Sequence, residues 1–247
     1  MIGFRKLALV QAKLYLREPM SAMFTLAFGP LLLLLLGSIF GNEPSEATGG
    51  IGYLDASVPS YMAIIVAIVG LTAVPITSAL RREQGILRRF SATPLRPLTY
   101  FLTDVLVPFA MTLAGILLVI LVGRVVFGVR FHGNLLSLLA GIALGAAAFF
   151  SLGYALVGLI PSARAVTVIG NVVLYPLMIF SGSMVPLQVM PESVRAISRY
   201  VPLTHLVTLL RGLWSGQPWT GFWVEAIVLA GMAVACTLVV ARTFRWE

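Results

Sequence analysis

The chain has 247 residues, of which 59% are apolar and only 11% are charged, and its mean hydropathy is +0.99. A soluble domain is about half apolar and about a quarter charged, because its surface must face water. Seventeen Lys and Arg against nine Asp and Glu give a net charge of +8, and the single Cys236 excludes an internal disulfide. The composition therefore excludes a disulfide-stapled secreted domain, a disordered chain and most soluble enzymes.

Six stretches almost free of charge divide the chain, and each is long enough to cross a bilayer, which takes about 20 apolar residues. They cover residues 19–42, 56–80, 105–123, 131–163, 165–191 and 212–242, the last broken by Glu225. Lys and Arg lie mostly in the short segments between these stretches, so we expect no nucleic-acid partner. The sequence predicts an all-α polytopic protein with six transmembrane helices in the lipid bilayer.

The charge of the loops predicts the topology. The N-terminal segment, residues 81–96, the turn at Arg164 and the C-terminus together hold twelve of the seventeen Lys and Arg. Because basic loops stay in the cytoplasm, we expect a multi-pass protein of the bacterial inner or plasma membrane with both termini cytoplasmic. Trp214, Trp219 and Trp223 are expected at the outer membrane interface and Trp246 at the inner one.

The first 18 residues have the pattern of an amphipathic helix. Its basic and apolar residues occupy neighbouring sides of such a helix, with Lys6, Lys13 and Arg17 against Leu7, Val10 and Leu14. A basic amphipathic helix lies along a membrane face. We therefore expect residues 1–18 to form an N-terminal interface helix rather than a cleaved signal peptide.

The cytoplasmic loop at 81–97 is basic but also carries apolar side chains. Ile86, Leu87 and Phe90 are residues that water does not favour and that a protein partner could cover. We expect a short helix to continue from the end of span two to about Ala92, before the prolines of the loop. The alternative is an ordinary solvated loop on the cytoplasmic side.

The outer segment at 186–213 contains two short helical patterns joined at Pro202. Pro191 suits the first position of the first helix, and Gly212 could end the second. Neither piece is long enough to cross the bilayer. The pattern predicts an outer re-entrant helical hairpin between spans five and six, shielded by the other spans.

Sequence motifs at these two loops match a known family. After span two the family has Glu-x-Gly, then Leu, then Thr-Pro-Leu, and this chain has Glu83, Gly85, Leu87 and Thr93–Leu95. After span five the family has Ser-Gly, two prolines and Pro-Leu-Thr, and this chain has Ser181, Gly182, Pro186, Pro191 and residues 202–204, followed by Arg211. With these motifs the chain resembles the permease subunits of ABC-2 type (type V) ABC transporters, in particular the drug and antibiotic exporter branch that includes daunorubicin-resistance permeases. Pro59–Ser60 departs from the Pro-Gly that this family often has there.

The resemblance implies a single ABC-2 transmembrane domain over residues 1–247, coupled to two copies of a separate ABC ATPase subunit. The loop at 81–97 would be the main coupling helix, and the turn at Arg164 a second contact. The residues expected to couple to the ATPase are Arg82, Glu83, Gly85, Leu87, Arg88, Arg89, Thr93, Pro94 and Arg164. A second permease copy, identical or paralogous, would complete the transporter.

The chain lacks the sequence of an ATP-binding loop. It has no Gly-x-x-x-x-Gly-Lys-Ser/Thr motif and no Gly-Lys dipeptide. We expect a transport subunit rather than an enzyme, with no cofactor of its own, because ATP and Mg²⁺ would bind to the partner ATPase. Secondary transport is the rival class, but Asp104 and Glu225 lie near span ends rather than at the membrane midplane.

The resemblance also implies that spans two and five of two copies line the transport path. The expected path consists of polar and proline residues at helical spacing, namely Thr72, Pro75, Ser78, Asn171 and Tyr175. The expected outer gate, at the outer end of span five, consists of Met178, Phe180, Met184 and Pro186. Ordinary helix packing is the alternative for each set. An uncharged path suits hydrophobic or amphiphilic, drug-like substrates. The alternatives are an exporter of a lipid-linked glycan or lipid, and a non-transporting membrane sensor or assembly subunit.

Overall fold

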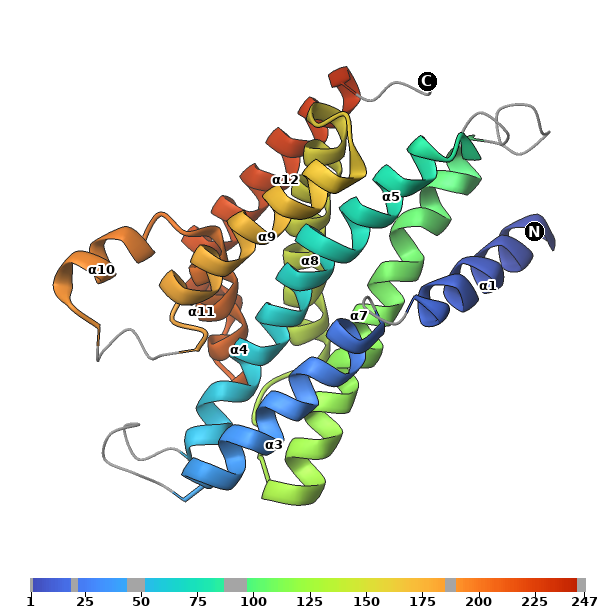
Figure 1. The fold of residues 1–247 in the computed structure, drawn as a ribbon. Coiled ribbons are helices and arrows are strands. Elements are labelled where there is room, and N and C mark those ends of the chain that lie inside the picture. Colours follow the sequence, from blue (N-terminus) through green and yellow to red (C-terminus); the bar gives the residue numbers. More distant parts are fainter. Residues whose placement is uncertain (1, 19–21, 44–51, 87–96, 185–189, 244–247) are drawn as a thin grey trace.

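The computed structural model describes residues 2–18, 22–43, 52–86, 97–184 and 190–243, which fold into a helical bundle (Figure 1). Six segments are long and apolar enough to cross a membrane, which confirms the predicted number of spans. Spans one to six are Met23–Phe40, Tyr53–Glu83, Thr103–Phe127, Leu135–Leu159, Ala163–Phe180 and Trp219–Thr243. The described residues contain no β-strand, so the all-α polytopic class is confirmed.

Each span is built from one or more of the helices in Figure 1. Span one joins the π-helical η1 (Met23–Ala27) to α3 (Phe28–Phe40). Span two joins α4 (Tyr53–Ile68), the π-helical η3 (Val69–Ala73) and α5 (Val74–Glu83). The other helices are α1 (Ile2–Arg17), α7 (Pro97–Phe127), α8 (Leu135–Leu159), α9 (Ala163–Phe180), α10 (Glu192–Ser198), α11 (Pro202–Trp214), the 3-10 helix η5 (Trp219–Phe222) and α12 (Trp223–Thr243).

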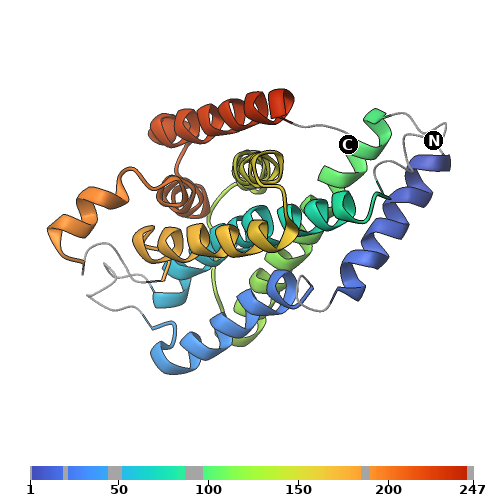
Figure 2. The ribbon, with the colours of Figure 1, turned by 45° about the horizontal axis from the view of Figure 1, so that its top comes forward.

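Span two forms the centre of the bundle. In its most apolar window 78% of the residues are buried, against 6% in span six. Its helices pack against α3, α7, α8, α9 and α11, and Figure 2 shows them between α12 on one side and α3 on the other. A helix surrounded in this way is apolar on all sides, as the buried run at 61–71 is. The outer spans instead leave large apolar side chains such as Leu117 and Ile227 exposed, as lipid-facing helices do.

Glycines on the neighbouring helices make room for the two π-helical segments. A Cβ atom built at Gly115 would overlap the carbonyl oxygen of Thr25 in η1. Cβ atoms at Gly153 and Gly170 would overlap the carbonyl oxygens at 70 and 71, in η3. A π-helical turn is wider than an α-helical one and occurs frequently at functional sites. The sequence therefore supplies a glycine at three places where a widened turn closely approaches another helix.

The structure shows a break at 84–85 in the helix expected from span two to about Ala92. α5 ends at Glu83, and Gly85 has φ +64°, a left-handed conformation that ends helices and that glycine adopts without a steric penalty. Residues 87–96 lie outside the described residues. The remainder of the coupling loop at 81–97 therefore stays a prediction.

The start of span six and the position of Trp214 also differ from the prediction. α11 continues to Trp214, and span six begins only at Trp219. Trp214 is buried and packs on Phe131, with ring centroids 4.8 Å apart, so its ring belongs to the core and does not face lipid. Trp223, in contrast, is 63% exposed.

The outer segment contains the two short helices that the sequence predicted. α10 extends to the side of the bundle, whereas α11 begins at Pro202 and packs against α4, α8 and α12 (Figure 1). Leu203, Leu206 and Leu210 on α11 are fully buried. The other spans thus shield the second half of the outer hairpin, while residues 186–189 lie outside the description.

Candidate functional site

The last turn of α5 binds the turn that joins α8 to α9. The guanidinium of Arg82 donates hydrogen bonds to the carbonyl oxygens of Val157, Ile160 and Pro161 at 2.5, 2.6 and 2.9 Å. The Glu83 carboxylate accepts a 2.6 Å hydrogen bond from the backbone N–H of Ala163. We call Arg82, Glu83 and residues 157–163 the clamp, and the end of the bundle that carries it the clamp end.

The clamp provides hydrogen-bond partners for the backbone groups at both helix ends that meet at this turn. The last carbonyls of α8 carry partial negative charge, which the Arg82 cation complements, and the first N–H groups of α9 carry partial positive charge, which the Glu83 anion complements. The Ser162 hydroxyl accepts a further bond from the N–H of Ala165 at 3.2 Å. The clamp therefore connects the end of α5 to spans four and five.

Four of the expected coupling residues fall within the described part of the chain. Arg82 and Glu83 form the clamp, Gly85 makes the turn after it, and Arg164 is exposed directly beyond Ala163. The structure thus brings Arg164 and the start of the coupling loop to one place. The other expected coupling residues, Leu87, Arg88, Arg89, Thr93 and Pro94, lie outside the described residues.

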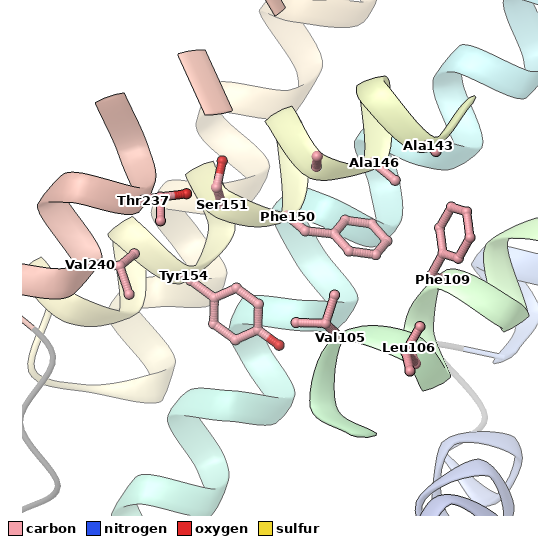
Figure 3. A pocket seen from close by; sticks show the side chains of 11 residues that line it. Val105, Leu106, Phe109, Ala143, Ala146, Phe150, Ser151, Tyr154, Thr237 and Val240 are labelled. Atoms are coloured by element: carbon pink, nitrogen blue, oxygen red, sulfur yellow. The ribbon is translucent and has the colours of Figure 1, made fainter. Parts of the chain in front are cut away.

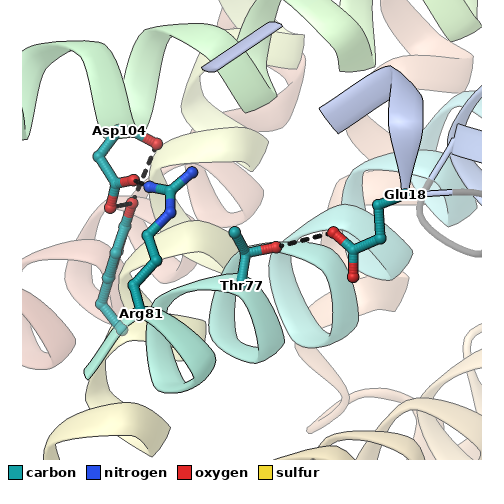
Figure 4. Close-up of polar contacts among 5 residues, drawn as sticks. Glu18, Thr77, Arg81 and Asp104 are labelled. Atoms are coloured by element: carbon teal, nitrogen blue, oxygen red, sulfur yellow. Dashed lines mark hydrogen bonds and ion pairs between the residues drawn. The ribbon is translucent and has the colours of Figure 1, made fainter. Parts of the chain in front are cut away.

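A buried ionic cluster lies beside the clamp (Figure 4). Arg81 on α5 forms an ion pair with Asp104 on α7. The hydroxyl of Tyr154 on α8 donates to the Asp104 carboxylate at 2.9 Å and lies 3.1 Å from its backbone oxygen. Farther along α5, Thr77 donates to Glu18 at 3.5 Å. The cluster joins spans two, three and four at the clamp end, and no sequence pattern predicts that these three residues meet.

A pocket between spans one, two and five contains most of the expected path residues. Its volume is about 190 Å³. It is lined by Phe24, Thr25, Phe28, Ile68, Thr72, Ala73, Ile76, Thr167, Asn171, Leu174, Tyr175 and Met178. We call it the path pocket. No lining residue is charged, and the two π-helical segments form one wall of the pocket opposite α9.

The polar groups of the path pocket differ in whether they already have partners. Thr72 and Thr167 donate to the carbonyl oxygens four residues earlier, at 2.6 and 2.9 Å, and Thr25 is bonded to Tyr15. Asn171 and Tyr175 make no side-chain hydrogen bond within the described part of the chain. Their amide and hydroxyl are therefore available to a ligand.

The remaining expected path and gate residues lie elsewhere. Pro75 lies against Gly153 of α8, and Ser78 lines a small polar pocket that also contains Arg81 and Asp104. Of the expected gate residues, Met178 lines the path pocket itself, whereas Phe180 packs on the core. Met184 is 40% exposed, and Pro186 lies outside the described residues.

The N-terminal helix is attached to the path pocket by one hydrogen bond. Tyr15 is buried, and its hydroxyl lies 2.6 Å from that of Thr25 in η1. Burial raises the pKa of Tyr15 to about 12, so the phenol remains neutral at physiological pH. α1 docks through Gln11 and Tyr15, both buried, and leaves apolar residues such as Leu14 exposed. This open stripe suits the membrane face predicted for the helix.

At the opposite end of the bundle, Arg211 of α11 joins three elements. Its guanidinium donates to the Ser60 hydroxyl of α4 at 2.9 and 3.1 Å and to the carbonyl oxygen of Gly182, after α9, at 3.0 Å. Burial lowers the pKa of this guanidinium. Ser60, which departs from the family's Pro-Gly pattern, thus provides the side-chain acceptor for Arg211.

Three known proteins are similar to this chain in sequence. The inner membrane transport permease YhhJ of Escherichia coli is 28% identical over 189 residues, covering 74% of this chain and 50% of that protein. The probable doxorubicin resistance ABC transporter permease protein DrrC of Mycobacterium tuberculosis is 26% identical over 222 residues, covering 87% and 78%. Nodulation protein J of Rhizobium leguminosarum is 33% identical over 85 residues, about a third of each chain.

The chain spans about half the length of the Escherichia coli permease that it matches. The family model described as ABC-2 type transporter matches residues 4–214, which include the clamp, the path pocket and Arg211. The chain therefore belongs to the ABC-2 type transporter family.

Proposed function

We propose that this chain is the transmembrane permease subunit of an ATP-driven exporter for hydrophobic or amphiphilic, drug-like molecules. The observation that carries the proposal is the path pocket, where residues from spans two and five meet in a site without charge. Asn171 and Tyr175 have polar groups free for a ligand there. A doxorubicin resistance permease among the relatives supports the same substrate class.

The chemistry of the pocket favours one class of substrate. Burying a charged group is costly unless a partner of opposite charge meets it, and no lining residue offers one. Apolar walls with a few convergent polar groups are typical of small-molecule sites. The pocket therefore suits an apolar molecule that carries one or two hydrogen-bonding groups near Asn171 and Tyr175.

Energy would come from a separate ABC ATPase, two copies of which hold ATP and Mg²⁺. The loop at 81–97 and the turn at Arg164 would dock on these subunits. The clamp supports this route, because Arg82 and Glu83 bond directly to the end of α8 and to the start of α9. Movement of the docked loop would pass through α9 to Asn171 and Tyr175.

A second permease copy, identical or paralogous, would close the path. One side of α9 exposes apolar and aromatic residues at helical spacing, namely Val168, Val172, Tyr175 and Ile179 at 55 to 63%. Tyr175 belongs both to this stripe and to the path pocket. A second copy on the stripe would therefore complete the wall of the pocket, with Met178, Phe180, Met184 and Pro186 toward its outer gate.

Reconstitution tests the proposal. The chain, its ATPase and any second permease are placed in vesicles, and ATP-dependent movement of a panel of fluorescent amphiphiles is measured. We expect transport that Asn171→Leu reduces strongly and that Tyr175→Phe reduces less. Tyr200→Phe is the matched control, because Tyr200 is 88% exposed and lies outside the pocket. Equal transport by Asn171→Leu and the wild type, or no ATP-dependent movement of any amphiphile, would contradict the proposal.

A further inference from the structure

A second and larger cavity lies between α7, α8 and α12 (Figure 3). Its volume is about 320 Å³, and it shares no lining residue with the path pocket. It forms because α7 packs mainly on α1, α3 and α4, whereas α8 packs on α12. Leu106, Ala143 and Ala147 line the cavity and are exposed, so it opens to the outside of the bundle.

Every hydroxyl on the walls of this cavity already has a partner. Tyr154 donates to Asp104, Ser151 to the carbonyl oxygen of Ala148 at 2.9 Å, and Thr237 to that of Ala233 at 2.7 Å. The other lining residues are apolar, and none is charged. The walls thus offer a ligand only apolar contact, in contrast to the path pocket with its free amide and hydroxyl.

We propose that this cavity binds an acyl chain of a membrane phospholipid. All three surrounding helices are membrane spans, and every lining residue lies within its span. On α8 the lining runs from Ala143 near the middle of the span to Tyr154, and on α7 and α12 it lies toward the clamp end, from Val105 to Phe109 and from Thr237 to Val240. The opening therefore meets the hydrocarbon of the bilayer, and hydrocarbon matches the walls. The volume lies at the lower end of the range for ligand sites, about 300 to 1,000 Å³, which favours a single chain over a whole lipid.

The bound chain would support the ionic cluster at the clamp end. The Tyr154 ring forms part of the cavity wall, and its hydroxyl holds the Asp104 carboxylate that pairs with Arg81 (Figures 3 and 4). Filling the cavity fixes the ring and with it this hydrogen bond. The inference requires only that the spans lie in a bilayer, so it does not depend on the proposed substrate or on the ATPase.

Photolabelling tests the inference. The chain is reconstituted in vesicles that contain a phospholipid with a diazirine in one acyl chain, irradiated, and its adducts are mapped by mass spectrometry. We expect labelling at Ala143, Ala147 and Val240 to exceed labelling at Leu121 several-fold. Leu121 is 55% exposed on α7 and lies outside the cavity, so it reports ordinary contact with bulk lipid.

A matched pair of variants tests whether the labelled lipid lies in the cavity. Ala147→Phe places a ring in the cavity, whereas Ala140→Phe places the same ring on the exposed part of α8 outside it. We expect Ala147→Phe to reduce labelling at Val240 to the level of Leu121, and Ala140→Phe to leave it unchanged. Wild-type labelling of the cavity no greater than that of Leu121 would overturn the inference, and this comparison needs no variant to fold.

Discussion

The carboxylate of Glu83, the last residue of α5, accepts a 2.6 Å hydrogen bond from the backbone N–H of Ala163, the first residue of α9. At the clamp, the end of span two is thereby bonded to the start of span five, although 80 residues separate the two partners. Glu83 belongs to the family motif in the expected coupling loop. Its bond to Ala163 shows that this motif residue also has a partner inside the permease.

Removing this cap tests the clamp. Glu83→Ala deprives the Ala163 N–H of its acceptor, whereas Glu83→Gln keeps an oxygen in the same place. Loss of a helix cap costs about 1 kcal/mol, so we expect the protein to insert and fold in both cases. ATP-coupled transport in reconstituted vesicles should fall much further in Glu83→Ala than in Glu83→Gln.

The control for this pair is Glu192→Ala, which removes an exposed glutamate from the first turn of α10. It should transport like the wild type. Transport by Glu83→Ala at the wild-type rate per inserted permease would show that the clamp does not carry motion to α9.

The glycines beside η3 make a second prediction. Gly153→Ala and Gly170→Ala each place a methyl group on a carbonyl oxygen of the π-helical segment, and such overpacking costs about 1 to 3 kcal/mol. Both should lower the thermal unfolding temperature of the purified protein. Gly231→Ala in α12, where a Cβ atom meets nothing within 4 Å, should leave it unchanged or raise it. Equal effects at all three positions would mean that helix propensity alone, and not the close approach, decides the outcome.

The Arg81–Asp104 pair makes a third prediction. Asp104→Asn leaves the buried charge of Arg81 beside a neutral amide, and breaking a buried pair in this way typically costs about 3 to 5 kcal/mol. The double variant Arg81→Met, Asp104→Leu removes both charges and should recover much of that loss. Unfolding of the purified proteins in mild detergent measures all three. A double variant less stable than Asp104→Asn would contradict this expectation.

Tyr15 makes a prediction about pH. Burial raises its pKa to about 12, whereas the phenol of a tyrosine in water titrates near about 10. The unfolded chain would therefore release this proton first, so the stability from Tyr15 is complete below about pH 10 and is lost as the pH rises toward about 12.

The ultraviolet absorbance of the phenolate measures this titration directly. The difference between the wild type and Tyr15→Phe should rise near pH 12 rather than near pH 10. Tyr15→Phe should also lose the bond to Thr25 and loosen α1, which faster hydrogen exchange in α1 would report. A difference that titrates near pH 10 would contradict the burial of Tyr15.

The sequence predicted the spans because hydropathy alone decides them. Charge-free stretches of about 20 residues have few alternatives to crossing a bilayer, and the six observed spans follow them closely. Helical spacing also placed Thr72, Asn171 and Tyr175 on spans two and five, and all three line the path pocket. Whether these residues bind a substrate stays a prediction.

The other parts of the site depend on contacts that no local pattern reveals. Thr25 reaches the path pocket through a π-helical turn, and Asp104 meets Arg81 only because spans two and three pack at one end. Thr167 could have been found, since it lies four residues before Asn171 on the same side of α9. The residue type of Trp214 favours a membrane interface, but its neighbours bury its ring.

The central claim is that a transported amphiphile passes through the path pocket between span two and α9. Photolabelling of the reconstituted transporter with a photoreactive analogue of a transported amphiphile tests it most directly. We expect adducts on Thr72, Asn171 and Tyr175 that the unlabelled amphiphile displaces and that ATP turnover reduces. Adducts confined to other surfaces, with these three residues unlabelled while transport proceeds, would contradict the account.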